Sequence, residues 1–316
     1  MSTYIIRRIL LMIPTLFFVT VLVFLVVRLL PGDVVETIIG QYTPLTEGNR
    51  EAVRHDLGLD RPWYQQYFEF VGGAVRGDFG RSLQSQQPVT ADLRDRLPVS
   101  AELGLMAIFI GLIWAIPIGV LAAIRQDSLL DHVSRSTAIA FIAMPSFWLG
   151  TLVVVLPNVW WRWAPPIQYR SFLNDPSENL YFLIFPAAIL GLTISGGMMR
   201  LTRAQMLEVL RQDYIRTAWS KGLRERTIVV RHALKNALIP VITLVALQIP
   251  VVVGGTVVLE TVFNVPGMGR YLVDAANGSD YPVIQAVNLI VALIVVFANL
   301  AVDLVYAYLD PRIRYG

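Results

Sequence analysis

Six long apolar stretches constrain this 316-residue chain more than any other feature. A helix needs roughly 20 apolar residues to cross about 30 Å of hydrocarbon, and each stretch has about that length. The stretches cover residues 9–29, 103–124, 136–159, 180–199, 238–258 and 283–306. Only 16% of the residues are charged, whereas soluble domains carry about 25%. The sequence therefore predicts an all-α, polytopic membrane protein with six transmembrane helices.

The first stretch follows Arg7 and Arg8, as the apolar core of a signal peptide would. It is longer than the 7–15 residues typical of such a core, and no small-residue cleavage site follows it. We therefore interpret this stretch as a retained span.

The chain divides into three expected parts. Residues 1–30 form the N-terminal tail and first span, residues 31–98 an external segment, and residues 99–316 a five-helix core. The external segment is expected to hold a short amphipathic helix, a turn and a second helix rich in aromatic residues. These aromatic residues suit a membrane interface or a small packed subdomain. They are Trp63, Tyr64, Tyr67 and Phe68.

Basic residues predict the orientation in the membrane. Nine of the 26 cationic residues lie between residues 200 and 236, and others flank the first span and the C-terminus. The short loops on the opposite side carry only Arg162, Arg170 and Arg270. Because Lys and Arg concentrate in cytoplasmic loops, we expect both termini and the basic loop to be cytoplasmic. No basic patch is interleaved with exposed aromatics, so membrane lipid rather than nucleic acid is the expected anionic partner.

Proline residues mark places where a span can bend, because proline cannot donate a backbone hydrogen bond. Among the prolines within the predicted spans are Pro14, Pro117, Pro145, Pro240 and Pro250.

Groups that could perform chemistry inside the membrane are scarce. The polar residues of the spans and their ends include Arg28, Gln248, Glu260, Asn299 and Asp303. They form no series of the kind that a proton relay needs, and we expect Glu102 and Asp303 to be paired or capped rather than catalytic.

Metal and nucleotide sites are also not predicted. The three histidines have no metal-site spacing, the chain has no cysteine, and no phosphate-binding Gly-rich loop ends in Gly-Lys-Ser/Thr. We therefore expect no catalytic residue, metal or resident cofactor. Energy for transport must come from a partner, or the chain is a passive pore.

The basic segment RQDYIRTAWSKGLRERTIVVRHALKNALIP, residues 211–240, predicts a helix–turn–helix between two spans. Asp213 is the expected N-cap and Gly222 the C′ residue of a helix over 214–221. A second helix is expected from about Arg224 toward the fifth span.

The first of these helices carries apolar side chains that suit a protein groove, namely Tyr214, Ile215 and Trp219. Ala218 leaves room for close packing at the bend. The alternative is a solvated loop that packs on its own helices or lies along anionic headgroups.

The form DYIRTAWSKGL…RHALKNALIP resembles the cytoplasmic coupling loop of ATP-binding-cassette importer permeases. Aligned on Gly222, the general Glu-Ala-Ala pattern falls on Arg216, Thr217 and Ala218, and Arg-Thr-Ala is the form of the dipeptide/oligopeptide/nickel subfamily. His232 falls at the Ile position of the general pattern, and Lys235 at its Pro. The N-terminal IIRRILLMIPTLFFVTVLVFLVVRLLPGD, then GDFGRSL, PVSAELGL, GGTVVLETVFNVPGMGR and NLAVDLVYAYLDPRIRYG resemble the same subfamily in order.

The resemblance implies a type I importer permease fold and the B-type member of a permease pair. The implied partners are a homologous second permease, two cytoplasmic ABC ATPases that bind ATP-Mg, and an external solute-binding protein. The implied ATPase contacts are Asp213, Tyr214, Arg216, Ala218, Trp219, Lys221 and Gly222. The residues implied to support the loop are Arg231, His232 and Asn236. Residues lining the path are not identified.

Di- or oligopeptides are the cargo that the resemblance favours. Nickel chelates and oligosaccharides remain alternatives within the same subfamily. From a different class, a stand-alone secondary transporter or channel, or a non-transporting membrane scaffold, also remains open.

Overall fold

The computed structural model describes residues 2–29, 60–254 and 257–309, and the secondary structure of these residues is helical apart from one isolated β-bridge between Arg81 and Pro88. The all-α class predicted from the sequence is confirmed. Contacts divide the chain into two compact units, residues 1–98 with 267–316 and residues 99–266. This grouping differs from the three expected parts, because the C-terminal residues pack with the N-terminal ones.

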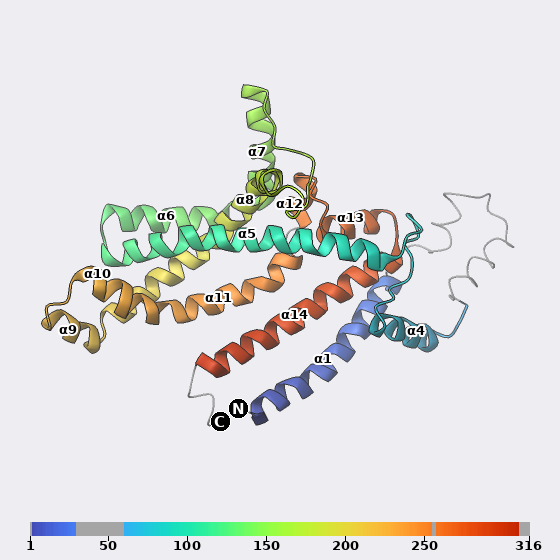
Figure 1. Ribbon diagram of the computed structural model, residues 1–316, viewed down its shortest axis with the longest axis horizontal. Helices are drawn as coiled ribbons and strands as arrows, with labels where there is room; N and C mark the ends of the chain where they lie inside the picture. Colours follow the sequence, from blue (N-terminus) through green and yellow to red (C-terminus); the bar gives the residue numbers. More distant parts are fainter. Residues whose placement is uncertain (1, 30–59, 255–256, 310–316) are drawn as a thin grey trace. The chain divides into compact units, whose positions relative to one another are not determined.

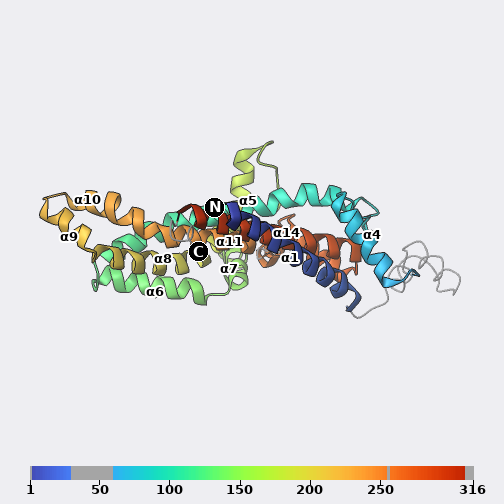
Figure 2. The ribbon, with the colours of Figure 1, turned by 90° about the horizontal axis from the view of Figure 1, so that it is seen from below.

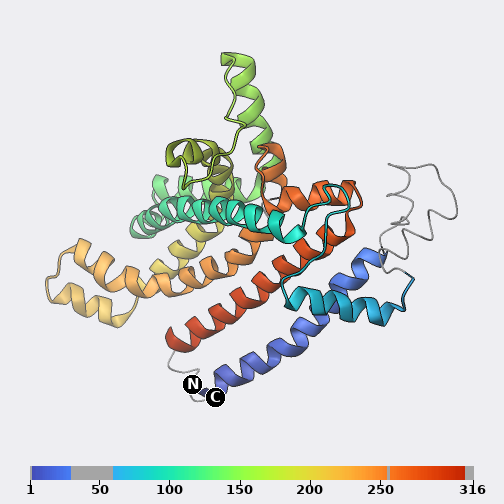
Figure 3. The ribbon, with the colours of Figure 1, turned by 45° about the vertical axis from the view of Figure 1, so that its right-hand side comes forward.

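The first unit is built on two long helices. Helices α1 (Ser2–Leu29) and α14 (Tyr281–Leu309) run side by side (Figures 1 and 3). Helix α4 (Trp63–Val75) packs on α1, where the hydroxyls of Thr20 and Tyr67 share a hydrogen bond of 2.8 Å. Helix α4 confirms that the predicted aromatic-rich helix forms. The amphipathic helix expected before it lies outside the described residues.

A loop over residues 76–88 follows α4 and is fixed by a buried carboxylate. Asp280, only 2% exposed, accepts a hydrogen bond from the Ser82 hydroxyl. It also accepts from the backbone amides of Leu83 and Gln84, at 3.1 and 3.4 Å. Three donors on one carboxylate hold the loop against the turn that precedes α14.

Helix α13 (Met268–Asn277) adds a second polar contact to this unit. The Tyr271 hydroxyl donates a hydrogen bond of 2.7 Å to Asp92. Burial, together with this bond, raises the pKa of Tyr271. Apolar residues beneath, among them Val89 and Met268, complete the core of the unit.

The second unit is organised around the longest helix within it, α8 (Pro176–Leu210). Helix α6 (Leu129–Ala143), α7 (Ser146–Trp161) and α11 (Lys235–Gly254) pack against it. The short α12 (Val257–Val262) contacts α7. Helix α5 (Val89–Ile124) begins in the first unit and belongs to the second from Val99 onward.

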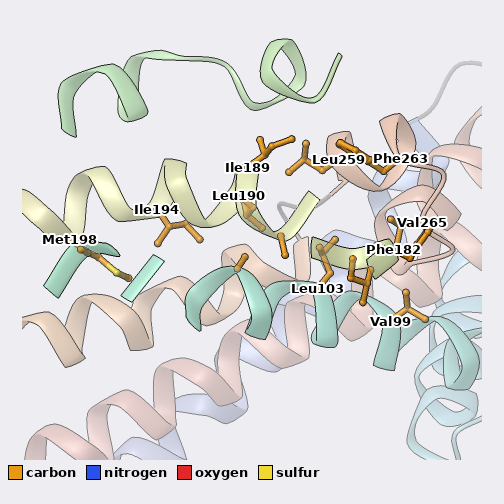
Figure 4. Packing of buried hydrophobic residues seen from close by; sticks show 14 of the residues in the cluster. Val99, Leu103, Phe182, Ile189, Leu190, Ile194, Met198, Leu259, Phe263 and Val265 are labelled. Carbon is orange, nitrogen blue, oxygen red and sulfur yellow. The ribbon is translucent and has the colours of Figure 1, made fainter. Parts of the chain in front are cut away.

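The core of the second unit joins α5, α8 and α12. Figure 4 shows Leu103 from α5, Phe182 and Ile194 from α8, and Leu259 from α12 within this cluster. The helices approach closely at Gly191, where an added Cβ would lie 2.7 Å from the Ala107 carbonyl oxygen. Close backbone approach through small residues is a common means of packing helices in membranes.

Five of the six predicted spans overlap segments long and apolar enough to cross a membrane, and four of these segments lie in single helices, α1, α5, α8 and α14. The fifth segment, Glu225–Gln248, begins before the predicted stretch 238–258 and ends within α11. The expectation of one helix over residues 136–159 is wrong. Helices α6 and α7 meet there at an angle of 92°. Pro145 lacks an amide N–H and disfavours a helical conformation at the preceding residue, and Met144 is accordingly extended, with ψ of 123°.

Acidic residues near the helix ends are paired, as expected for Glu102. Its carboxylate accepts hydrogen bonds from the Tyr169 hydroxyl at 3.3 Å and the Asn179 amide at 3.2 Å. Burial and the neighbouring Glu102 raise the pKa of Tyr169, a loop residue, to about 12. Glu260 is fully buried and accepts a bond of 2.7 Å from Ser100. The side chain of Asp303 lies outside the described residues.

Candidate partner-docking site

The basic segment folds into a compact bend between two spans, which we call the knuckle (residues 211–235). Helix α9 (Asp213–Ser220) follows α8, and α10 (Glu225–Thr227) and the π-helix η1 (Ile228–Leu234) lead into α11. The helix–turn–helix predicted from the sequence is therefore confirmed. The knuckle lies at one end of α8 and α11, away from α7 (Figures 1 and 2).

One face of α9 is buried in the second unit. Ile215 is fully buried and Ala218, three residues later, is 7% exposed. Together they pack in a cluster that contains Met206 of α8 and Val229 of η1. Burying one large aliphatic side chain contributes about 1.5–3 kcal/mol, so this face holds α9 against the ends of the neighbouring helices.

The turn after α9 is a Schellman motif. The Leu223 amide donates to the Ala218 carbonyl at 3.4 Å, and the Gly222 amide to the Trp219 carbonyl at 2.9 Å. Gly222 has φ of +69°, which confirms the prediction that it is the C′ residue. No atom lies within 4 Å of a Cβ added there. A side chain at Gly222 would therefore meet conformational strain rather than a clash.

The start of α9 differs from the prediction by one residue. Gln212, not Asp213, is the N-cap, because Gln212 already has the extended conformation, with ψ of 149°. Asp213 is the first helical residue, and its side chain is 96% exposed. There it complements the positive end of the helix dipole and lies 3.4 Å from Arg216.

The other face of α9 points away from the core. Trp219 is 49% exposed and Tyr214 44%, although both are large aromatic residues. Arg216 and Lys221 are exposed beside them. The outward face thus combines cations with aromatic rings, the side chains that most often dominate protein interfaces.

Seven residues were expected to contact an ATPase, and five of them have outward side chains: Asp213, Tyr214, Arg216, Trp219 and Lys221. Gly222 is exposed at the turn. Ala218 instead packs inward at the bend, where its small side chain allows the close approach. The prediction that Ile215 faces a partner together with Tyr214 and Trp219 is wrong. Ile215 lies on the opposite, buried face of α9.

Asn236 connects α9 with the beginning of α11. Its side-chain amide donates a hydrogen bond of 2.8 Å to the Tyr214 hydroxyl and one of 3.1 Å to the His232 carbonyl. Among the three residues expected to support the loop, Asn236 bridges with its side chain and His232 contributes its backbone. Arg231 is exposed on η1.

The π-helix η1 was not predicted. Its sequence IVVRHAL shows an ordinary apolar pattern, and no local signal marks the wider turn. The wider turn buries Ile228, Val229 and Ala233 while Val230 stays 55% exposed. Such segments are rare and occur frequently at functional sites.

Comparison with known proteins agrees with this architecture. The family model for the binding-protein-dependent transport system inner membrane component matches residues 115–315. The model for the N-terminal part of these membrane components matches residues 1–104. The chain therefore belongs to this family of multi-pass inner-membrane transport components, which confirms the importer-permease resemblance.

Individual relatives are similar over the whole chain. The di/tripeptide transport system permease protein DppB of Pseudomonas aeruginosa is 39% identical, covering 100% of this chain and 99% of its own. The dipeptide transport system permease protein DppB of Escherichia coli is 37% identical with the same coverage. The glutathione transport system permease protein GsiC of Escherichia coli is 40% identical, with 100% of both chains covered.

Proposed function

We propose that this chain is the permease subunit of an ATP-driven, binding-protein-dependent importer of di- or oligopeptides. The names of the relatives, which refer to dipeptides, di/tripeptides and glutathione, support this cargo over nickel chelates or oligosaccharides. The chain would form half of the translocation path beside a homologous second permease. An external solute-binding protein would deliver the cargo.

The observation that carries the coupling role is the two-faced construction of α9. Ile215 and Ala218 fix the helix to its own unit, while Arg216 and Trp219 remain outward. Exposed aromatic rings beside an arginine have the composition that is enriched at protein interfaces. The knuckle is thus suited to a groove on a cytoplasmic ATPase.

The orientation that fits this role has the knuckle and both termini in the cytoplasm, in accordance with the basic residues. ATP-Mg would be bound and hydrolysed by two ATPase subunits, and this chain would supply no catalytic residue. Closure of the ATPase pair on ATP would displace the knuckle. The helices would then change from an inward-facing to an outward-facing arrangement, because the nucleotide binds these two states of the complex with different affinity.

The test is a comparison of two exposed tryptophans in the complex of both permeases, the ATPases and the binding protein. Trp219→Ala removes an aromatic residue of the knuckle that is 49% exposed, and Trp161→Ala removes a more exposed one, at 70%, on α7. Loss of a hot-spot residue costs about 2 kcal/mol, so Trp219→Ala should weaken ATPase association roughly 30-fold. Trp161→Ala should leave it unchanged.

The same complex in proteoliposomes reports the cargo. Peptide pools should stimulate ATP hydrolysis, whereas oligosaccharides or nickel chelates should not. Equal ATPase association of both tryptophan variants would contradict the docking role. Stimulation by oligosaccharides or nickel chelates alone would contradict the peptide cargo while leaving the docking role intact.

A further inference from the structure

A cationic cleft lies between α6 and α8, apart from the outward face of the knuckle. Its volume is about 660 Å³, and Arg135, Arg200 and Arg203 line it. Small-molecule sites commonly enclose about 300–1,000 Å³. The cleft therefore has the size of a ligand site, and its polar lining is of one sign.

The three arginines are not equally available. Arg203 donates to both carboxylate oxygens of Asp131, at 2.6 and 2.7 Å, and Asp131 is fully buried. Arg135 lies 3.6 Å from the same carboxylate. Arg200 is exposed and has no carboxylate partner among the residues that the structure describes. Asp131 is thus shared by Arg135 and Arg203, whereas Arg200 lacks a counter-charge among the described residues.

The remainder of the lining is apolar. Ile139 of α6 is 57% exposed, and Leu201 of α8 is half-buried. Gly197 also lines the cleft, and no atom is found within 4 Å of a Cβ added to it. Glycine here leaves open space rather than making a close helix contact. The cleft therefore pairs cations with an apolar strip that has room beside it.

The position along the helices corresponds to the edge of the hydrocarbon. Arg200 directly follows the apolar stretch 180–199 of α8, and Arg135 directly precedes the stretch that begins at 136. Cations at the end of a span lie at the level of the lipid headgroups. Two helices thus place an arginine at the same boundary, with apolar residues on its membrane side.

We propose that this cleft binds an anionic phospholipid. The phosphate is held by Arg135 and Arg200, and an acyl chain lies along Ile139 and Gly197. Basic pockets between membrane helices are known to take such headgroups. A soluble anion would use the arginines but leave the apolar strip in water, so the combination favours a lipid. The proposal does not depend on the docking of α9.

The experiment uses the assembled complex of both permeases and ATPases in nanodiscs of phosphatidylcholine and phosphatidylglycerol. Phospholipids that remain bound on release are counted by native mass spectrometry. Retained phosphatidylglycerol should exceed its share of the bilayer. Arg200→Gln should lower its apparent affinity about five-fold, which is the ~1 kcal/mol of one arginine at a membrane surface.

A second variant tests the shape of the cleft without changing its charge. Gly197→Leu fills the space beside the apolar strip and should reduce phosphatidylglycerol retention as Arg200→Gln does. Two controls match these changes. Arg211→Gln removes an exposed arginine at the C-terminal end of α8, outside the cleft, and Gly72→Leu fills open space on α4. Both should retain wild-type lipid.

Three results would overturn the proposal. Phosphatidylglycerol could show no excess in the assembled complex, as expected if the partner permease covers the cleft. Its excess could survive both Arg200→Gln and Gly197→Leu. It could also fall with Arg200→Gln but not Gly197→Leu and be displaced by inorganic phosphate, which would indicate a soluble anion.

Discussion

Two segments that connect helices, the loop 76–88 and the knuckle, are both held in place, but by opposite means. The loop is fixed by polar groups, because the buried Asp280 accepts three hydrogen bonds from Ser82, Leu83 and Gln84. The knuckle is fixed by apolar packing of Ile215 and Ala218. Its charged groups remain on the outside.

The difference indicates what each segment is able to do. A segment whose polar groups are used internally has a firm shape and few groups left for a partner. A segment fixed by apolar residues keeps its cations and aromatic rings available. The knuckle is therefore the better candidate for a regulated protein contact, and loop 76–88 is better described as a structural support.

The largest expected effect contrasts Asp280, the acid that holds the loop 76–88 from outside it, with Asp213, an acid within the knuckle. Asp280→Ala leaves buried donors without an acceptor and should destabilise the loop by on the order of 3 kcal/mol. Asp213→Ala removes an exposed carboxylate from the knuckle and should have almost no effect on folding.

Trypsin cleavage reports both changes. Asp280→Ala should accelerate cleavage after Arg81 in the loop roughly 100-fold if local opening controls the rate. Cleavage after Arg216 should not change in Asp213→Ala. A similar response of the two segments would contradict the distinction between polar and apolar fixation.

An intermediate effect is expected at two glycines with left-handed backbone. Gly222 in the knuckle has φ of +69° and Gly77 in the loop +76°, and no atom lies within 4 Å of an added Cβ at either. Valine at either position should cost about 1–2 kcal/mol of folding free energy. Only Gly222→Val should also change the direction in which α9 leaves its turn.

The measurement is the number of peptides imported per ATP hydrolysed in proteoliposomes. Gly222→Val should insert into the membrane normally but uncouple transport from hydrolysis, whereas Gly77→Val should keep the wild-type ratio. Normal coupling in Gly222→Val would count against a role of this turn in docking.

The smallest effect is expected at the bridge between α9 and α11. Asn236→Ala and Tyr214→Phe each remove the same exposed hydrogen bond of 2.8 Å, which contributes about 0.5–1.5 kcal/mol at most. Because the chain has no cysteine, Arg216→Cys provides a single maleimide-labelling site on α9. Each change should raise the labelling rate slightly.

The double variant of Asn236 and Tyr214 should label no faster than Asn236→Ala alone, because Asn236→Ala already removes the shared bond as well as the one to the His232 carbonyl. Additive increases would show that the two residues stabilise α9 independently.

Local sequence patterns predicted the features that depend on neighbouring residues. Gly222 could be placed because a left-handed turn after a helix favours glycine, and five spans could be placed by their apolar length. The predicted N-cap, Asp213, is one residue too late. Several residue types tolerate the N-cap conformation, and here Gln212 adopts it without a capping side-chain bond.

Features that depend on distant residues could not be predicted in this way. Pro145 indicates a possible bend, but the continuous apolar pattern of 136–159 does not reveal that α6 and α7 meet at 92°. The contacts of Asp280 with Ser82, and of Asp131 with Arg203, join residues far apart in the chain. The inward face of α9 likewise became clear only once Met206 and Val229 lay against Ile215.

The length of helix α8 determines how far a tilt displaces its ends. The helix is continuous over 35 residues, through Pro186, so its length is about 52 Å, against roughly 30 Å of hydrocarbon. It is one unbroken helix from Pro176 to Leu210, and the knuckle follows it directly. A tilt of about 10° along such a rod displaces one end by roughly 9 Å relative to the other. Under the proposed coupling role, a movement of the knuckle would therefore be transmitted along α8 to its other end.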